Sequence, residues 1–277
     1  MKLFALIEDT VRSRITTVIV YFALATFFLV IGLIVAIFVD PASMVQSPGS
    51  AAKTQQGPMP VDLASLPGII DFFLVGLAGF VHFSAILLSV FATAGIIPST
   101  LEKGTVDLFL SKPISRAELL LGRFLGAILI VFVITAYFVF GAWLIVSIKT
   151  GYWNPGFLSI IVMVTVAYAV IYTAMMALGI STRSSAATII IVFFYIYILA
   201  PILAMREVGI YAVVTNDVVR VVVDGLYYIL PKSGEIGNIT AALILKQSAV
   251  WMPLWSSALF GAAMYGLSLF LLRRKDF

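Results

Sequence analysis

Residues 15–39 read ITTVIVYFALATFFLVIGLIVAIFV, a run without a charged side chain. An α-helix needs roughly 20 apolar residues to cross a hydrocarbon core of about 30 Å, so this run is long enough to span a membrane. It is also too long for the apolar part of a cleavable signal peptide, which has about 7–15 residues. We therefore expect a membrane-spanning helix that is retained in the protein.

The composition of the whole chain agrees with this expectation. Of its 277 residues, 62% are hydrophobic and 11% are charged, and the mean hydropathy is +1.14. Soluble domains are roughly 45–50% apolar and about 25% charged, and a fold of this size cannot bury so much apolar surface. The sequence therefore predicts an all-α integral membrane protein. Because it contains no cysteine, it has neither disulfides nor thiolate-bound metal sites.

Further uncharged runs of spanning length lie at 72–97, 124–148, 157–182, 184–205 and 251–272. With their flanking turns, we expect one transmembrane domain (1–277) with six spans, at 15–39, 70–97, 119–148, 157–182, 184–205 and 251–272. Arg183 alone separates the fourth span from the fifth, which predicts a tight polar turn. Gly122 and Gly126 favour a close helix contact, within one chain rather than between two.

Six spans place both termini on one side of the membrane. Most of the basic residues are expected on that side: Lys2, Arg12, Arg14, Lys103, Lys112, Arg116, Arg123, Arg183, Arg273, Arg274 and Lys275. Loops on the cytoplasmic side carry an excess of Lys and Arg, so both termini are predicted to be cytoplasmic. The net charge of +4 then reflects topology and does not indicate nucleic-acid binding.

Residues 1–14 favour an amphipathic helix lying along the cytoplasmic interface, because Leu3, Phe4, Ile7 and Val11 share one side. The alternative is a frayed, solvated terminus. The first outer loop, 40–68, is rich in proline and serine and is typical of an exposed linker.

The second outer loop, 206–250, has a helical charge pattern. Asp217, Arg220 and Asp224 recur at i, i+3 and i+7, so they can pair on one helical face. The valines between them would also suit a strand, but the charge spacing favours an amphipathic or re-entrant helix. A break at 231–234 and a second apolar stretch at 236–245 precede the last span.

The inner loop, 98–118, combines charge with large apolar side chains. Ser115 and Glu118 have the spacing of a capping box, and Ile114 and Leu119 have that of a hydrophobic staple, which predicts where the third helix begins. Pro113 ends the preceding piece, and Lys103, Lys112 and Arg116 are expected to point to water. This rigidity suits a lever at the membrane surface. The alternative is an interfacial helix hairpin that only caps the bundle.

The inner loop resembles the hallmark stretch of permease subunits in type-2 ATP-binding-cassette (ABC) exporters. The similar residues are Glu102-Lys103-Gly104-Thr105, then Leu108-Phe109-Leu110-Ser111-Lys112-Pro113-Ile114-Ser115-Arg116, and Leu119-Leu120-Leu121-Gly122-Arg123-Phe124. Permeases of nitrous-oxide-reductase maturation, gliding-motility and sodium-export systems are similar. The six spans, the interfacial N-terminal helix and the long loop before the last span match this family along the whole chain.

The resemblance implies a coupling helix that sits in a groove of a separate ATPase. Carried over by position, the ATPase-coupling residues are Glu102, Lys103, Gly104, Thr105, Asp107, Lys112, Pro113, Ser115 and Arg116. It implies two ATPase copies, a second copy of this chain or a related permease, and the cytoplasmic (inner) membrane of a prokaryote as location. The complex would export an unidentified substrate or transmit force to a periplasmic or extracellular partner. ATP and Mg would bind the ATPase, so this chain itself would be neither an enzyme nor a cofactor carrier.

Other classes of membrane protein fit less well. Proton- and sodium-driven carriers commonly use acids inside the membrane, but none of the 13 carboxylates lies deep in an expected span, Asp71 being the nearest. The chain has no phosphate-loop motif for ATP hydrolysis. The alternative outside the ABC class is an autonomous channel or secondary transporter without an ATPase.

The single histidine, His82, lies in the middle of the second span, near Ser84. A serine–histidine dyad needs convergent side chains and an oxyanion hole, but helix positions two apart point in different directions. We therefore expect His82 and Ser84 to be packed or pore-lining, and we expect no catalytic, cofactor-binding or metal site.

Overall fold

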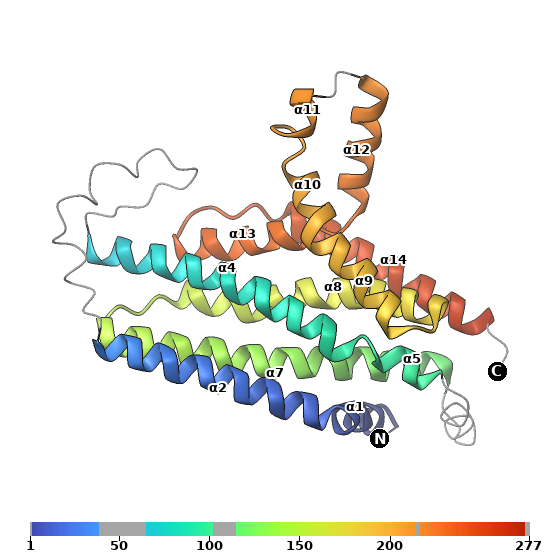
Figure 1. Ribbon diagram of the computed structural model, residues 1–277, viewed down its shortest axis with the longest axis horizontal. Helices are drawn as coiled ribbons and strands as arrows, with labels where there is room; N and C mark the ends of the chain where they lie inside the picture. Colours follow the sequence, from blue (N-terminus) through green and yellow to red (C-terminus); the bar gives the residue numbers. More distant parts are fainter. Residues whose placement is uncertain (1, 39–64, 102–114, 214–215, 275–277) are drawn as a thin grey trace.

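The computed structural model describes residues 2–38, 65–101, 115–213 and 216–274. Within these ranges every regular element is a helix (Figure 1). Six of the helices described are long and apolar enough to cross a membrane: Ile15–Phe38, Leu66–Thr100, Arg116–Thr150, Pro155–Thr182, Ser185–Ala204 and Met252–Arg274. The expected all-α integral membrane fold is therefore confirmed.

Several spans consist of more than one helical piece. In chain order, the six spans are α2 (Ile15–Phe38), α4 (Leu66–Thr93) with α5 (Ile96–Thr100), α7 (Arg116–Thr150), η1 (Pro155–Leu158) with α8 (Ser159–Thr182), α9 (Ser185–Phe194) with η2 (Tyr195–Leu199) and α10 (Ala200–Ala204), and α14 (Met252–Arg274). The other helices are α1 (Lys2–Ser13), α11 (Ile210–Val213), α12 (Asp217–Ile229) and α13 (Ser233–Ile244). The helix expected over 1–14 is thus present, and it is not a frayed terminus.

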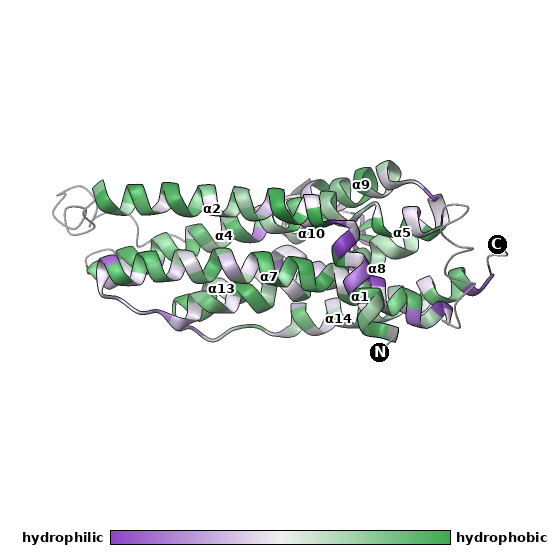
Figure 2. Ribbon diagram, turned by 90° about the horizontal axis from the view of Figure 1, so that it is seen from below, coloured by the Kyte–Doolittle hydropathy of each residue, from purple (hydrophilic) through white to green (hydrophobic). Residues whose placement is uncertain are grey.

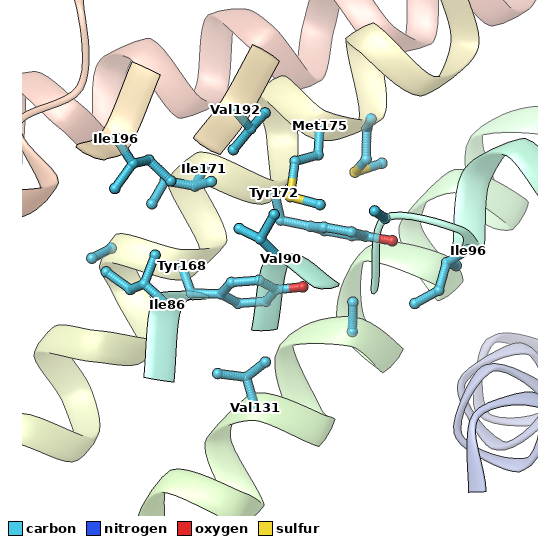
Figure 3. Close-up of a cluster of buried hydrophobic side chains, with 14 of the residues drawn as sticks. Ile86, Val90, Ile96, Val131, Tyr168, Ile171, Tyr172, Met175, Val192 and Ile196 are labelled. Carbon is cyan, nitrogen blue, oxygen red and sulfur yellow. The ribbon is translucent and has the colours of Figure 1, made fainter. Parts of the chain in front are cut away.

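α8 is the centre of the bundle. Of its most apolar stretch 56% is buried inside the protein, against 6% for the peripheral α2. The rings of Tyr168 and Tyr172 stack on each other among apolar side chains of the neighbouring helices (Figure 3). The Tyr168 hydroxyl donates to Thr93 Oγ1 on α4 at 2.7 Å. This bond gives the buried Tyr168 hydroxyl a hydrogen-bond partner, which lipid hydrocarbon could not provide. It also joins α8 to α4.

The outer surface of the bundle is apolar. α2 is hydrophobic along its length (Figure 2), and Ala25 is its one buried residue. Large side chains such as Phe27, Leu33 and Ile37 are exposed on it. Lipid tails are as apolar as these side chains, so a bilayer can cover this surface without a polar penalty.

The first helix and the end of the last helix lie at the same end of the bundle (Figure 1). α1, α5 and the last turn of α14 lie together there, on the right of Figure 1. We call this the terminal end, and the other the opposite end. The turn from α8 to α9 contains Arg183 in a left-handed conformation with φ 52°, and its N–H donates to the Gly179 carbonyl at 3.0 Å. This is the tight turn that the sequence predicts.

The fifth span changes its helical winding just before Pro201. Proline lacks an N–H and its ring clashes with the carbonyl four residues earlier, and the helix widens here into the π-turn η2. The hydroxyls of Tyr195 and Tyr197 donate to the carbonyls of Pro231 and Phe83. These bonds hold the fifth span against α4 and against the turn before α13.

The segment between the fifth and sixth spans re-enters the bundle. α13 packs against α4 and α8 and buries Ile236, Ile239 and Ile244. Its first residue, Ser233, accepts a hydrogen bond at 2.9 Å from His82, which lies midway along α4. α13 therefore begins near the middle of the bundle and runs towards the opposite end (Figure 1).

α12 differs from α13 because it stands away from the bundle (Figure 1) and has no buried residue. The charge spacing of this segment predicted a helix, whereas its valines would also have suited a strand. The structure confirms the helix. The re-entrant part of this segment is thus α13, and α12 is its amphipathic part.

Candidate functional site

Most of the predicted coupling residues lie outside the described residues: Glu102, Lys103, Gly104, Thr105, Asp107, Lys112 and Pro113. Their contact with an ATPase stays a prediction. The structure does describe the elements that hold the two ends of this segment, α5 before it and α7 after it. We therefore take the terminal end of the bundle as the candidate site.

α7 begins with the capping box that the sequence predicts. Ser115 Oγ accepts from the Glu118 N–H at 3.1 Å, and Glu118 Oε2 accepts from the Ser115 N–H at 2.8 Å. A cap of this kind stabilises a helix by about 1 kcal/mol. Ile114, the expected staple partner of Leu119, lies outside the described residues. The cap fixes where α7 begins.

Arg116 is attached to α14, and the expectation that it points to water was wrong. Its Nη1 donates to the carbonyls of Leu272 at 2.9 Å and Arg273 at 3.1 Å. The last carbonyls of a helix have no intrahelical partner and carry partial negative charge, so a guanidinium is favoured there. Arg116 thus ties the start of the third span to the end of the sixth.

α1 lies across α7 and is seen end-on in Figure 1. A Cβ at Gly122 would lie 2.5 Å from Leu6 Cβ, and a Cβ at Gly126 would lie 2.7 Å from Thr10 Cβ. Glycine is therefore required at both positions for α1 to approach so closely. The predicted contact is within one chain, as expected, and the helix that makes it is α1.

An ion pair between a buried arginine and a half-exposed aspartate adds to this contact. Arg123 Nη2 lies 3.0 Å from Asp9 Oδ2, and Arg123 Nη1 donates to Thr10 Oγ1 at 3.0 Å. The Arg123 side chain is 7% exposed and that of Asp9 is 52% exposed. Losing Asp9 is therefore costly, because the arginine charge buried on α7 needs a counter-ion. Sequence reasoning missed this pair, since nothing in the spacing of α1 indicates which residue of α7 it meets.

The opposite end has a polar network of its own. Asn154 Nδ2 donates to Asp71 Oδ1 at 2.7 Å and to the Ile244 carbonyl at 2.9 Å, and the Tyr152 hydroxyl donates to Asp71 Oδ2 at 3.1 Å. Asn154 is 1% exposed. Asp71 lies within α4 and is thus held by neutral donors, which join α4 to η1 and α13 and give the network a structural role.

This network predicts that Asn154→Asp strongly destabilises the protein. The substitution places two carboxylates in contact and removes the donor to Ile244, with an expected loss of about 3–5 kcal/mol. Thermal unfolding in a neutral detergent measures it. Asp71→Asn combined with Asn154→Asp restores one donor–acceptor pair, so the double variant should be more stable than Asn154→Asp. If both variants melt like the wild type, the network carries no stability.

His82 and Ser84 have separate partners. His82 bonds to the Ser233 carbonyl on α13, and its ring lies 3.5 Å from the Cβ position of Gly237. Ser84 Oγ donates to the Phe80 carbonyl on its own helix at 2.7 Å. His82 therefore joins α4 to α13, and the hydrogen bonds do not form a dyad. A role for either residue in lining a pore stays a prediction.

A second polar cluster, which the sequence did not reveal, lies where α10, α12 and α13 meet. Arg206 is 8% exposed, and its Nε donates to Asp224 Oδ1 at 2.8 Å. Its guanidinium carbon lies 3.6 Å from the centre of the Tyr227 ring, and the Tyr227 hydroxyl donates to Glu235 Oε1 at 2.6 Å. Asp224 was expected to pair along α12, but its partner here comes from the segment before that helix.

The surroundings of this cluster shift the ionisation of its members. The Tyr211 hydroxyl and then the Arg206 guanidinium hold the pKa of Asp224 below its ordinary value. Burial, followed by the bond to Glu235, raises the pKa of Tyr227 to about 12. Burial lowers the pKa of the Lys232 ammonium, and the Glu235 carboxylate opposes that change. At neutral pH Asp224 is therefore charged and Tyr227 is neutral.

Comparison with known proteins gives one family. The family model described as ABC-2 family transporter protein matches residues 7–276, nearly the whole chain. No curated protein matches the chain. The match includes every spanning helix described above and also residues 102–114, which lie outside the described residues.

Proposed function

The chain belongs to the ABC-2 transporter family and is a multi-pass membrane permease subunit of an ABC transporter, and from this premise we propose that it couples ATP hydrolysis by separate ATPase subunits to export of a substrate. The family implies an ABC ATPase partner. We further propose two ATPases per complex, a pair of permeases, and an inner-membrane location in a prokaryote with both termini in the cytoplasm. A related permease in place of a second copy is equally compatible.

The observation that supports this proposal best is the set of contacts that connects α7 to α1 and α14 at the terminal end. The coupling segment joins α7 directly, and α7 is capped at Ser115, tied to α14 by Arg116, and clamped to α1 by Arg123 and Asp9. A push on residues 102–114 would therefore move three helices together. A loop that only capped the bundle would not need such connections to both the first and the last helix.

In this mechanism ATP binding brings the two ATPases together and displaces the coupling segments. The displacement would tilt α7 with α14 and α1 and change the path between the two permeases. The energy comes from the difference in contact between the coupling segment and the two states of the ATPase, since a ligand shifts an equilibrium only by its differential affinity. ATP and Mg bind on the partner subunit in this scheme.

The test compares flux in liposomes with and without the ATPase. Substrate candidates loaded into vesicles should move in the complete complex with ATP and should not move through the permease alone. Flux through the permease alone would favour the alternative function, an autonomous channel or secondary transporter.

Transmission of force to a periplasmic or extracellular partner is a second candidate, which the resemblance to gliding-motility and nitrous-oxide-reductase maturation permeases allows. Deleting residues 46–58 of the first outer loop separates it from simple export. A force transducer should lose its outer partner in pull-down experiments, whereas an exporter should keep its ATP-dependent transport. Retention of both would argue against a role of that loop in force transmission.

A further inference from the structure

Two adjoining cavities lie where the chain turns into α13. The smaller has a volume of about 200 Å³ and the larger about 580 Å³. Both are lined by Ala204, Tyr227, Glu235 and Asn238, so they are neighbours along one side of α13. The predicted coupling function uses neither cavity.

Lys232 lines the smaller cavity and is 5% exposed. Its Nζ lies 3.3 Å from Ser256 Oγ and 3.8 Å from Met252 Sδ, and 4.5 Å from the centre of the Tyr227 ring. Among the residues that the structure describes, no carboxylate lies within the 4.0 Å of an ion pair with Lys232. A buried ammonium without a counter-ion is costly, so an anion beside it would be favoured.

The other charged groups nearby already have partners. Arg206 pairs with Asp224 at 2.8 Å and with Glu207 at 3.5 Å. The Glu235 carboxylate accepts the Tyr227 hydroxyl at 2.6 Å. Lys232 therefore has no carboxylate partner within ion-pair distance, and its ammonium contacts the Tyr227 and Tyr228 rings, 4.5 Å and 5.2 Å from their centres, instead.

The backbone at this point also favours an anion, although Glu235 already places one carboxylate in the first turn of α13. Lys232 is the N-cap of α13, and no side chain caps the helix there. The first N–H groups of a helix have no intrahelical carbonyl to bond, and they carry partial positive charge. A Cβ at Gly234 would meet no atom within 4 Å, so the space beside this first turn is open.

The rest of the smaller cavity is mainly apolar. Its walls include Ile196, Pro201, Leu203 and Leu230. A fully hydrated anion would gain little from these side chains, whereas a short hydrocarbon chain would lose its contact with water against them. The part of the cavity near Lys232 therefore suits a polar head group, and the apolar part suits the hydrocarbon chain of the same molecule.

We propose that this cavity binds an anionic amphiphile, with a carboxylate or phosphate monoester group beside Lys232 and the first turn of α13 and an apolar chain along Ile196, Pro201 and Leu203. Such a group could belong to a membrane lipid or to a soluble molecule. The site is a property of this chain alone, so it does not depend on the proposed coupling to an ATPase.

Calorimetric titration of the purified full-length chain with hexyl phosphate, in an uncharged maltoside detergent, tests the proposal. We expect saturable binding after subtraction of the signal from protein-free micelles. Lys232→Gln should weaken it by about tenfold or more, because a hydrogen-bonded charge contact is lost. Lys246→Gln is the matched control, since Lys246 is an exposed lysine just beyond the far end of α13, and it should bind like the wild type.

Further arms keep the test decisive if Lys232→Gln does not fold. Lys232→Arg keeps the charge and should retain binding, and Glu235→Gln should bind hexyl phosphate more tightly because a nearby negative charge is removed. Dihexanoyl phosphatidate binding more tightly than hexyl phosphate would identify a lipid as the source, and the reverse order a soluble amphiphile. The proposal is overturned if the wild type shows no saturable binding, if Lys232→Gln binds like the wild type, if Glu235→Gln binds more weakly, or if inorganic phosphate binds as tightly as hexyl phosphate.

Discussion

Glu102→Lys combined with Pro113→Ala is expected to uncouple ATP hydrolysis from transport while the chain still inserts into the membrane. Both residues belong to the segment that, by family resemblance, contacts the ATPase. Reversing a charge at a protein interface costs several kcal/mol when it creates a like-charge contact, and replacing a proline by alanine gives the chain more backbone freedom. The coupled activity should therefore fall by about a hundredfold, a loss of roughly 2.7 kcal/mol.

The measurement is ATP-dependent transport of the reconstituted complex together with its ATP turnover. Asp217→Lys combined with Pro67→Ala is a matched control, because it makes the same chemical changes at exposed positions on α12 and at the start of α4. The control should keep wild-type coupling. Wild-type coupling in the Glu102 and Pro113 variant would remove this segment from the mechanism.

Gly122→Val should release α1 from α7. A Cβ at position 122 would lie 2.5 Å from Leu6 Cβ, and that is too close for any rearrangement of the two side chains to relieve. Overpacking of this kind costs about 1–3 kcal/mol, and each 1.4 kcal/mol changes the population of undocked α1 by about tenfold. The connection between α1 and α7 at the terminal end would then be lost.

The natural chain has no cysteine, so a single cysteine at Leu6, which is 3% exposed, reports this release. The thiol of Leu6→Cys should react slowly in the parent chain and about tenfold or more faster in the Gly122→Val background. Gly76→Val is the control, because a Cβ on Gly76 of α4 meets no atom within 4 Å. Equal reaction rates in the Gly122 and Gly76 variants would contradict the close contact between α1 and α7.

The membrane fold could be predicted from sequence because hydrocarbon imposes a simple rule on each span separately. Uncharged length alone indicated the six spans, and local signals indicated some of their ends, such as the capping box at Ser115 and Glu118 and the turn at Arg183. Gly122 and Gly126 indicated a close contact without its partner. These signals are short-range properties of the sequence, and they were sufficient to predict the membrane fold.

Side-chain partners across long sequence distances could not be predicted in the same way. Arg116 looked solvated because its acceptors, the carbonyls of Leu272 and Arg273, belong to a helix far along the chain. The same holds for Arg123 with Asp9. Lys232 gave no signal at all, because its burial follows from the way α13 turns back into the bundle. The coupling residues from Glu102 to Pro113 lie outside the described residues, and their role still rests on family resemblance.

The central claim is that this permease works with a separate ATPase, and mild-detergent purification of the tagged chain from its native host tests it most directly. Mass spectrometry of the proteins that accompany it identifies any partner. We predict a phosphate-loop ATPase in a stoichiometric amount, which Glu102→Lys with Pro113→Ala should weaken. A chain that is intact and monodisperse but carries no ATPase, and that conducts solute by itself in liposomes, would contradict the account.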